Sequence, residues 1–184
     1  MKNIILMGAS RAGKSTFTKM LGKNFDNLMI IRTDIFRLAF REAIIKDLKL
    51  STSLLKDNMD YRNFVLSYYK YVNKYETDYI KVVDTVDFEP KDLSCFEDAL
   101  IICFGYPKAK REEIVNNWHK YDTDLDWTKN KKEEDLLDFA QKEIQKSKYL
   151  KDECEKYRVK FVDTSFDRER ILNQLLEDVK ASFL

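Results

Sequence analysis

The chain has 184 residues, of which 33 are Lys or Arg and 32 are Asp or Glu, so its formal net charge is +1. This length fits one domain with its own core. The balanced charge offers no basic face for sequence-independent nucleic-acid binding, and no apolar run approaches the roughly 18 residues that span a bilayer. We therefore expect neither a nucleic acid nor a membrane as a partner, and the oligomeric state stays open.

The cysteines and the single histidine give no metal-binding pattern. Cys95, Cys103 and Cys154 show no paired spacing, and His119 is predicted on a helix surface, so a zinc site is not expected. Cys103 lies in the apolar run "LIICF" and predicts a buried thiol, which is typical of a reducing compartment. Because the N-terminus also lacks a signal-peptide pattern, we expect a cytoplasmic location.

Five short apolar runs alternate with longer amphipathic segments. Their apolar residues are consecutive, which predicts strands covered on both faces, whereas 133–157 and the segment from Arg168 show helical spacing. This alternation predicts an α/β fold, a three-layer sandwich with helices on both faces of a parallel sheet. The predicted strands are 3–7, 27–31, 80–84, 99–104 and 159–163.

A longer segment, 34–79, separates the second and third predicted strands and is expected to form a helical insertion. It holds six of the ten tyrosines. These rings either cover a bound acceptor by stacking on it, or pack a helical subdomain with their hydroxyls in solvent. The six are Tyr61, Tyr68, Tyr69, Tyr71, Tyr75 and Tyr79.

The string "GASRAGKS" fits the phosphate-binding pattern GxxxxGK[ST] between a predicted strand and a predicted helix. Glycines allow successive backbone N–H groups to point at phosphate oxygens, and the helix N-terminus adds partial positive charge. Lys14 is expected to reach the β- and γ-phosphates as a catalytic residue, and the Ser15 hydroxyl to bind Mg²⁺. We therefore predict ATP and Mg²⁺ as cofactors. The predicted nucleotide-binding residues here are Gly8, Ala9, Ser10, Arg11, Ala12, Gly13, Lys14, Ser15 and Thr16.

Other P-loop classes fit less well. A signalling GTPase requires DxxG and NKxD, but "DTVD" at 84–87 lacks the glycine and "NKKE" at 130–133 follows no apolar strand. Large motor and AAA-type ATPases need a longer chain. A small-molecule kinase remains.

The chain resembles the adenylate-kinase-like group of P-loop kinases, which includes nucleotide, shikimate and gluconate kinases. Besides the P-loop, the motifs that carry the resemblance are "TDIFR" at 33–37, "ALIICFGYPKAKREE" at 99–113 and "FVDTSFDRE" at 161–169. The resemblance implies strand order 2-3-1-4-5 and a single kinase domain over 1–184. It also implies a helical acceptor-side insertion at about 34–79 and a lid-like segment at about 121–132.

On the acceptor side, the resemblance implies that Asp34 lies near the transferred phosphate, where it assists Mg²⁺ or acts as the base for a hydroxyl. It implies that Arg37 binds an anionic group of the acceptor. Arg41 shares their predicted helix face and joins them as a candidate. The structural alternative is that Asp34 caps the helix and pairs with Arg37 at the surface.

On the nucleotide side, the resemblance implies that Asp84 holds Mg²⁺ through water and that Arg111 stabilises the transferring charge. A solvent-exposed Arg111 at a charged helix start is the alternative. Thr164 and Ser165 are implied to lie beside the adenine.

Two departures leave the acceptor open. Residues 121–132 contain lysines but no arginine, and the "DGFPR" motif of adenylate kinases is absent after the third strand. The sequence therefore predicts an ATP-dependent kinase for a nucleoside monophosphate or a metabolite hydroxyl. The alternatives are a nucleotide-binding regulatory or assembly protein with slow ATP hydrolysis, and a catalytically silent kinase.

Overall fold

A computed structural model describes residues 3–46, 59–96, 98–121, 126 and 128–183. Its five strands form one parallel sheet in the order β2-β3-β1-β4-β5, which confirms the predicted α/β fold and strand order. The strands begin and end within one residue of the predicted runs. They are β1 (Asn3–Gly8), β2 (Leu28–Arg32), β3 (Ile80–Asp84), β4 (Ala99–Gly105) and β5 (Lys160–Asp163).

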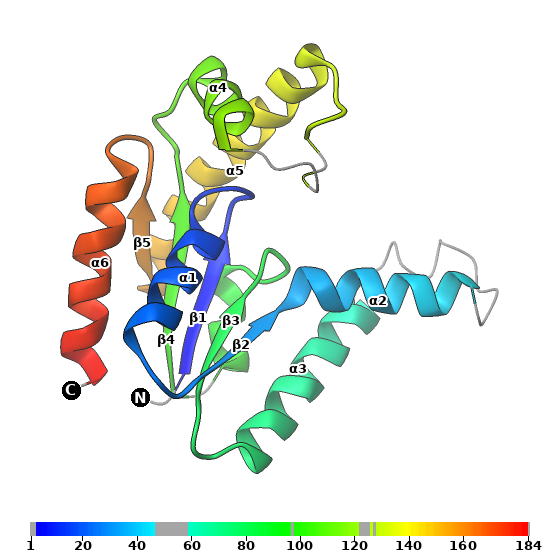
Figure 1. Cartoon of the computed structure of the whole chain (residues 1–184), viewed down its shortest axis with the longest axis vertical. Helices are drawn as coiled ribbons and strands as arrows, with labels where there is room; N and C mark the ends of the chain where they lie inside the picture. The colour runs from blue at the N-terminus through cyan, green and yellow to red at the C-terminus, as the bar shows by residue number, and fades with distance from the viewer. Residues whose placement is uncertain (1–2, 47–58, 97, 122–125, 127, 184) are drawn as a thin grey trace.

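Helices cover both faces of the sheet (Figure 1). Helix α2 follows β2 directly and extends away from the sheet, with α3 packed beneath it. The helices are α1 (Lys14–Asn24), α2 (Thr33–Lys46), α3 (Met59–Tyr75), α4 (Arg111–Tyr121), α5 (Glu133–Tyr157) and α6 (Arg168–Phe183), with a 3₁₀ helix η2 (Pro90–Cys95).

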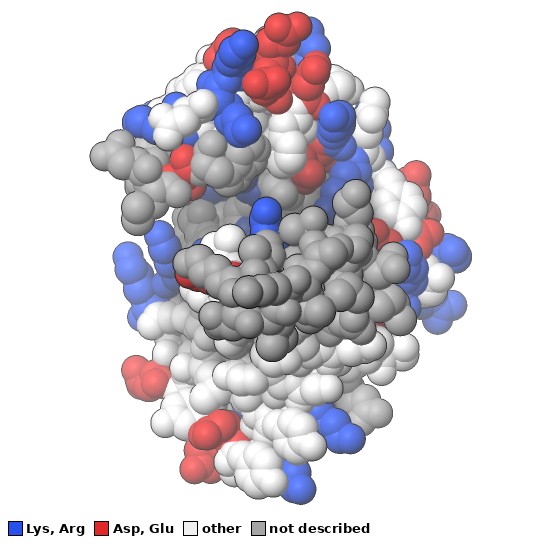
Figure 2. Space-filling model, turned by 90° about the vertical axis from the view of Figure 1, so that its right-hand side faces the viewer, with Lys and Arg blue, Asp and Glu red and all other residues white. Residues whose placement is uncertain are grey.

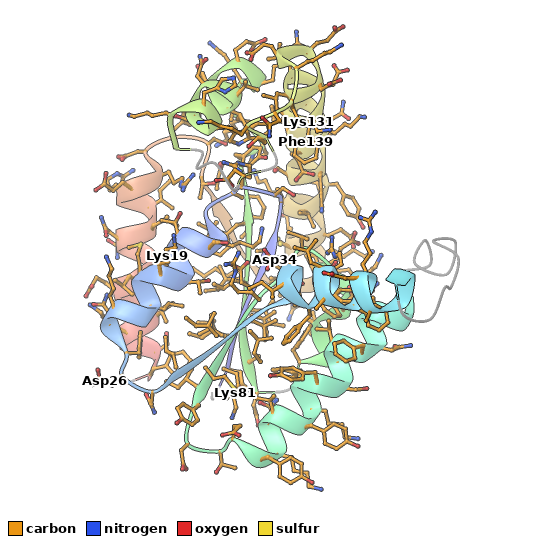
Figure 3. The ribbon with its side chains drawn as sticks, turned by 45° about the vertical axis from the view of Figure 1, so that its right-hand side comes forward. Lys19, Asp26, Asp34, Lys81, Lys131 and Phe139 are labelled. Carbon is orange, nitrogen blue, oxygen red and sulfur yellow. The ribbon has the colours of Figure 1, made fainter. Side chains whose placement is uncertain are left out.

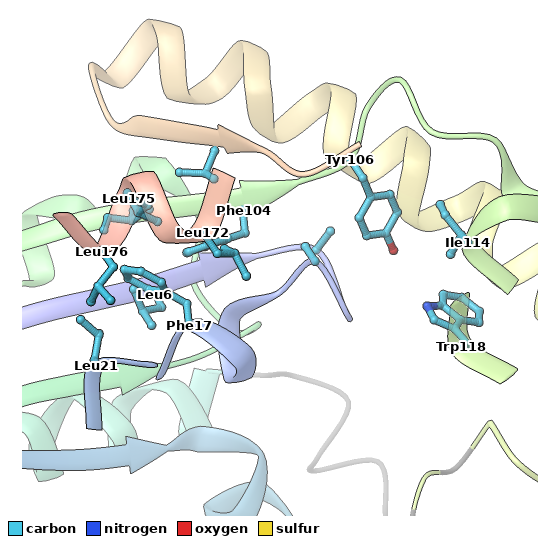
Figure 4. Close-up of a cluster of buried hydrophobic side chains, with 14 of the residues drawn as sticks. Leu6, Phe17, Leu21, Phe104, Tyr106, Ile114, Trp118, Leu172, Leu175 and Leu176 are labelled. Atoms are coloured by element: carbon cyan, nitrogen blue, oxygen red, sulfur yellow. The ribbon is translucent and has the colours of Figure 1, made fainter. Parts of the chain in front are cut away.

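The alternation of side chains along the central strand β1 separates two hydrophobic clusters, because successive residues of a strand point to opposite faces. Ile4 and Leu6 point to the face covered by α1 and α6, where Phe17 and Leu172 are fully buried (Figure 4). This cluster continues past the carboxyl ends of the strands to Trp118 of α4 and to the N-terminal half of α5. It therefore anchors the helices that lie beside the candidate site.

The second cluster lies on the opposite face, where Ile5 and Met7 of β1 meet α3, the residues Phe88 and Phe96 that flank η2, and the C-terminal half of α5. Tyr61 and Tyr69 of α3 are both buried here. The hydroxyl of Tyr61 donates to the carbonyl of Thr33, and the hydroxyl of Tyr69 accepts a hydrogen bond from Asn3. The packing alternative for the tyrosines therefore needs a correction, because these two hydroxyls are bonded inside the protein and not in solvent.

Other predictions concern single residues and exposed segments. Cys103 and Cys154 are buried thiols, as expected for Cys103, whereas Cys95 is exposed. His119 is half exposed and its Nε2 lies 2.9 Å from Glu133 Oε2. In the described ranges no helix has the length and apolarity required to cross a membrane. Residues 122–125 and 127 of the proposed lid lie outside the described residues, as does the stretch 47–58 of the proposed insertion.

Candidate active site

The glycine-containing loop runs from the end of β1 to the start of α1, and two of its positions require glycine. Gly8 has φ of +125°, and a Cβ there would lie 2.1 Å from the carbonyl oxygen of Phe104. Gly13 has φ of +106° and immediately precedes the first residue of α1. Because L side chains rarely adopt these conformations, the loop path depends on both glycines. Ala9 N–H donates to the Phe104 carbonyl, 2.9 Å away, and fixes the loop to β4.

Lys14, the first residue of α1, is buried beneath this loop. Its Nζ donates to the carbonyl oxygens of Ala9 at 2.7 Å and Gly8 at 3.2 Å. Burial lowers its pKa from 10.5 to about 8, against the opposing attraction of Asp84 and Glu143. The ammonium is therefore held inside the loop with its charge only partly compensated.

Ser15 and Asp84 meet at the carboxyl edge of the sheet. Ser15 Oγ donates to Asp84 Oδ2 at 2.8 Å, and Asp84 ends β3, the neighbour of β1. Burial raises the pKa of Asp84, while Lys14 and the Ser15 hydrogen bond oppose that rise. A hydroxyl and one carboxylate fit Mg²⁺, which is usually held by one or two protein oxygens together with substrate phosphates. In the described chain no group of three acidic, histidine or cysteine side chains offers a complete metal cage.

Asp34 lies in the first turn of α2, where this helix leaves the sheet (Figure 3). Its Oδ2 pairs with Arg32 at 2.9 Å, and its Oδ1 accepts the N–H of Ile35. Its charge also raises the pKa of Asp84, so the two carboxylates are close enough to interact electrostatically. Arg41, two turns further along α2, is exposed. Their proposed roles at the acceptor stay predictions.

Arg37 pairs with Asp87, and not with Asp34 as the structural alternative assumed. The Asp87 carboxylate is 6% exposed and also accepts a hydrogen bond from the Thr33 hydroxyl at 2.8 Å. The guanidinium of Arg37 lies 5.6 Å from the ring centre of Tyr61. Because it is held by an ion pair on one side and a ring on the other, Arg37 has a defined orientation at the start of the helical segment.

A pocket of about 370 Å³ opens between these residues and the phosphate loop. Ser10 of the loop forms one wall, so the pocket directly adjoins the P-loop. The remaining walls come from α2, α3, the segment after β3 and α5. The lining residues are Ser10, Arg37, Arg62, Val86, Asp87, Glu89, Lys91 and Lys146.

Helix α5 contributes a buried carboxylate to the phosphate loop. Glu143 Oε2 accepts the backbone N–H of Ser10 at 2.6 Å, across 133 positions of sequence. The Tyr106 hydroxyl donates to the carbonyl of the same residue at 2.9 Å. Burial raises the pKa of Tyr106, and the nearby Glu143 carboxylate adds to that effect. The central part of the loop is thus fixed through both backbone groups of Ser10.

The two candidate arginines of the nucleotide side lie in different surroundings. Arg11, with φ of +59°, forms an ion pair with Asp126 at 3.1 Å and lies 5.6 Å from the ring centre of Trp118. Arg111 begins α4 and pairs with its neighbour Glu112 at 2.8 Å on the surface. In the described part of the chain it has no contact with the loop, so its catalytic role stays a prediction.

The segment after β5 approaches the loop from the other side. Thr164 Oγ1 donates to the carbonyl oxygens of Ala12 and Gly105, at 3.0 and 3.1 Å. Ser165 Oγ donates to Asp163. Arg168 donates from Nη2 to the Thr16 hydroxyl at 2.8 Å. Thr164 therefore touches the predicted phosphate loop directly, whereas Ser165 lies one residue further out.

Several of these residues escaped the sequence analysis. Glu143 and Lys146 lie on an amphipathic helix rich in charge, where nothing in the sequence distinguishes them from solvent-exposed residues. Asp87 belongs to "DTVDFEP", which matches neither the GTPase DxxG motif nor the adenylate-kinase "DGFPR" motif and so indicated no role for it. Arg62 lies in the first turn of α3 with no motif beside it, and Arg168 lies in "FVDTSFDRE", where the resemblance gives it no role of its own. The fold brings these residues next to the P-loop. Only the expected strand order could have suggested that their segments lie there.

Comparisons with known proteins identify the fold. No protein-family model matches the chain, and no curated protein matches it in sequence. A shikimate kinase from Bacteroides thetaiotaomicron matches with a TM-score of 0.60 at 14% identity, covering 97% of this chain and 98% of its own. A dephospho-CoA kinase from Campylobacter jejuni matches with a TM-score of 0.56 at 11% identity, covering 100% and 99%.

A deoxyadenosine kinase from M. mycoides, with dCMP and dCDP bound, matches with a TM-score of 0.53 at 14% identity over 97% of this chain and 99% of its own. The chain has the fold of the P-loop small-molecule kinases. The resemblance inferred from the sequence motifs is therefore confirmed for the fold.

Proposed function

We propose that this protein is an ATP-dependent kinase that transfers the γ-phosphoryl group to a small molecule. One observation carries the proposal: the acceptor-sized pocket shares Ser10 with the predicted phosphate loop. A phosphate held by the loop and a molecule in the pocket would therefore be neighbours. The kinase fold of the matched structures supports the same reaction class.

The chain's own residues would act mainly by positioning and by neutralising charge. The backbone N–H groups of the loop and Lys14 would hold the phosphates of ATP. Ser15 and Asp84 would hold Mg²⁺, which when bound supplies further neutralisation of phosphate charge. An acceptor oxygen then forms a bond to the γ-phosphorus while the bond to the bridging oxygen of ADP breaks.

The proton of a hydroxyl acceptor needs a destination. Asp34 is the candidate base, because its carboxylate lies at the start of α2 and is close enough to Asp84 to raise the pKa of that residue. A nucleoside monophosphate would need no base, since its attacking oxygen is already anionic. Arg37 would bind an anionic group of either acceptor, and Thr164 would support the loop from the nucleotide side.

A second candidate function, a regulatory or assembly protein that hydrolyses ATP slowly, is favoured by the surface of the helical segment. Several apolar side chains are exposed along α2 and α3 (Figure 2, where the lower part of the face is mostly uncharged). Such a surface is typical of protein contacts. The most exposed are Ile35, Leu38, Tyr71 and Tyr75.

The test is ADP release from Mg·ATP, measured alone and with pooled acceptors. One pool contains nucleoside monophosphates, and the other contains hydroxylated metabolites. Stimulation by either pool, with a phosphorylated product seen by mass spectrometry, supports the kinase. Binding of ATP without stimulation by any pool would instead support the regulatory function, and replacement of Tyr71 and Tyr75 should then release the partner.

A further inference from the structure

The pocket beside the phosphate loop has a composition that narrows the acceptor class, and the inference rests on the kinase function proposed above. Its lining carries a net formal charge of +2, with four cationic side chains against two carboxylates. The cations come from four separate segments: α2, α3, the start of η2 and α5. An excess of positive charge in a concave site attracts an anionic ligand.

The four cations differ in how far their charge is already neutralised by carboxylates of the protein. Arg37 pairs with Asp87, and Lys91 pairs with Glu89. Arg62 pairs with Asp92 at 2.6 Å, but its guanidinium has five N–H donors and one carboxylate cannot engage them all. These pairs fix the arginines in place and leave donors for a ligand.

Lys146 has neither an ion-pair partner nor a hydrogen-bond partner among the described residues. It is half-buried on α5, one turn after Glu143, whose carboxylate holds the phosphate loop. Its charge also lowers the pKa of Lys14, which places the two ammonium groups near each other. A half-buried cation without a protein partner in a pocket wall can bind an anionic group of a ligand.

The same lining offers little to a nucleobase. Val86 is the one apolar lining residue in the described part of the chain. Two aromatic rings are engaged by arginines of the lining, since Arg62 lies 5.0 Å from the ring centre of Phe88 and Arg37 lies 5.6 Å from that of Tyr61. Sites for flat, weakly polar groups usually present free aromatic or aliphatic surface.

We propose that the acceptor is a small hydroxylated anion, a hydroxy acid or a sugar phosphate, whose carboxylate or phosphate is bound by Lys146 and Arg62. A hydroxyl of this molecule, and not a nucleoside monophosphate, receives the phosphoryl group. Lys146 supplies positive charge. The planar guanidinium of Arg62 can donate two parallel hydrogen bonds to a carboxylate or a phosphate. The polar remainder of the pocket hydrogen-bonds the other hydroxyls.

The test compares three molecules that share one carbon skeleton with one nucleoside monophosphate. The protein is first saturated with Mg·ADP, so that the phosphate loop is filled, and is then titrated calorimetrically with glucitol, gluconate, glucitol 6-phosphate and AMP. The same titrations are run on Lys146→Met, which removes the charge at similar size, and on Lys146→Arg, which restores it. Lys148→Met is the matched control, because Lys148 is an exposed lysine of the same helix.

We expect gluconate or glucitol 6-phosphate to bind at least 10-fold more tightly than glucitol and AMP, and the stronger of the two identifies the anionic group. Lys146→Met should lose about 10- to 100-fold of that affinity, as expected for a hydrogen bond to a charged group. Lys146→Arg should recover most of it, and Lys148→Met should behave like the wild type.

Two results overturn the proposal while leaving the kinase intact. One is preferential binding and phosphorylation of AMP or another nucleoside monophosphate, or of neutral glucitol. The other is anion binding that Lys146→Met weakens no more than Lys148→Met does. Failure of Mg·ADP to bind at all contradicts the kinase function itself, together with the acceptor class that rests on it.

Discussion

The nucleotide side and the acceptor side of the candidate active site are built in different ways. The nucleotide side consists of one short stretch, Gly8 to Thr16, whose backbone is fixed by Gly8, Thr164 and Glu143 and whose lysine is buried. The acceptor side consists of single charged side chains from four segments, most of them partly exposed. The first depends on backbone geometry, and the second depends on charge.

This difference predicts two kinds of mutational response. Changes on the nucleotide side should abolish turnover with any acceptor, because every substrate shares the phosphate chain. Changes on the acceptor side should alter which acceptor is used and leave nucleotide binding largely intact. An acceptor site made of separate side chains can change its specificity without disturbing the loop.

The largest effect is expected at Lys14. Lys14→Met removes the buried ammonium that would neutralise the transferring phosphate, and should lower kcat by about 10³-fold with every acceptor. Lys19→Met on the exposed side of the same helix is the control and should leave kcat unchanged. Steady-state ADP release measures both. Comparable losses in the two variants would mean that Lys14 acts only through the stability of α1.

Asp34→Asn separates the two acceptor chemistries. If a hydroxyl is the acceptor, loss of the base should lower kcat by about 10²-fold while the calorimetric Kd for Mg·ADP changes little. Asp84→Asn should instead weaken both kcat and the affinity for Mg·ADP, because Asp84 contacts Ser15. An Asp34→Asn variant that loses nucleotide affinity as Asp84→Asn does would place Asp34 with the metal site and leave the base unassigned.

Glu143 tests whether the loop depends on the fold around it. Glu143→Ala leaves the Ser10 N–H without its acceptor and should cost about 1–3 kcal/mol of stability and raise the KM for ATP. Glu143→Gln keeps a carbonyl oxygen at the same place and should restore most of the stability and of the KM for ATP. Thermal unfolding and ATP titrations check this. Equal defects in the two variants would show that the charge of Glu143, and not its hydrogen bond, is what matters.

Tyr61→Phe removes the hydrogen bond to the Thr33 carbonyl, which joins α3 to the start of α2. We expect a loss of about 1 kcal/mol in the free energy of unfolding, measured by urea denaturation. Tyr71→Phe, at a position 58% exposed, should change nothing measurable. An unaffected Tyr61→Phe would indicate that water replaces the bond, as in the sequence-based alternative in which the tyrosine hydroxyls lie in solvent.

The two sides also differ in how far the sequence predicted them. The loop, the strands and the approach of Ser15 to Asp84 follow from one contiguous motif and from where parallel strands end. Glu143 and Lys146 could not be found in this way, because they lie some 130 residues from the loop on a helix whose charges resemble solvent-exposed ones. Arg37 was singled out as an acceptor-binding candidate and that role stays a prediction, whereas its partner Asp87 depends on how the segment after β3 folds back.

The smallest effect concerns protons at Lys14. Its folded-state pKa of about 8 lies below the unfolded value of 10.5, so the unfolded chain binds more protons between these values and this group's contribution to stability rises with pH there. Bound phosphates favour the charged form and should raise the pKa again, so Mg·ADP binding at pH 8 should take up about half a proton. Calorimetry in two buffers of different ionisation enthalpy measures this uptake.

Lys14→Arg is the control, since a guanidinium is already charged at that pH and should take up none. Equal uptake in both proteins would assign the proton to another group and would mean that burial of Lys14 does not control the charge of the nucleotide side.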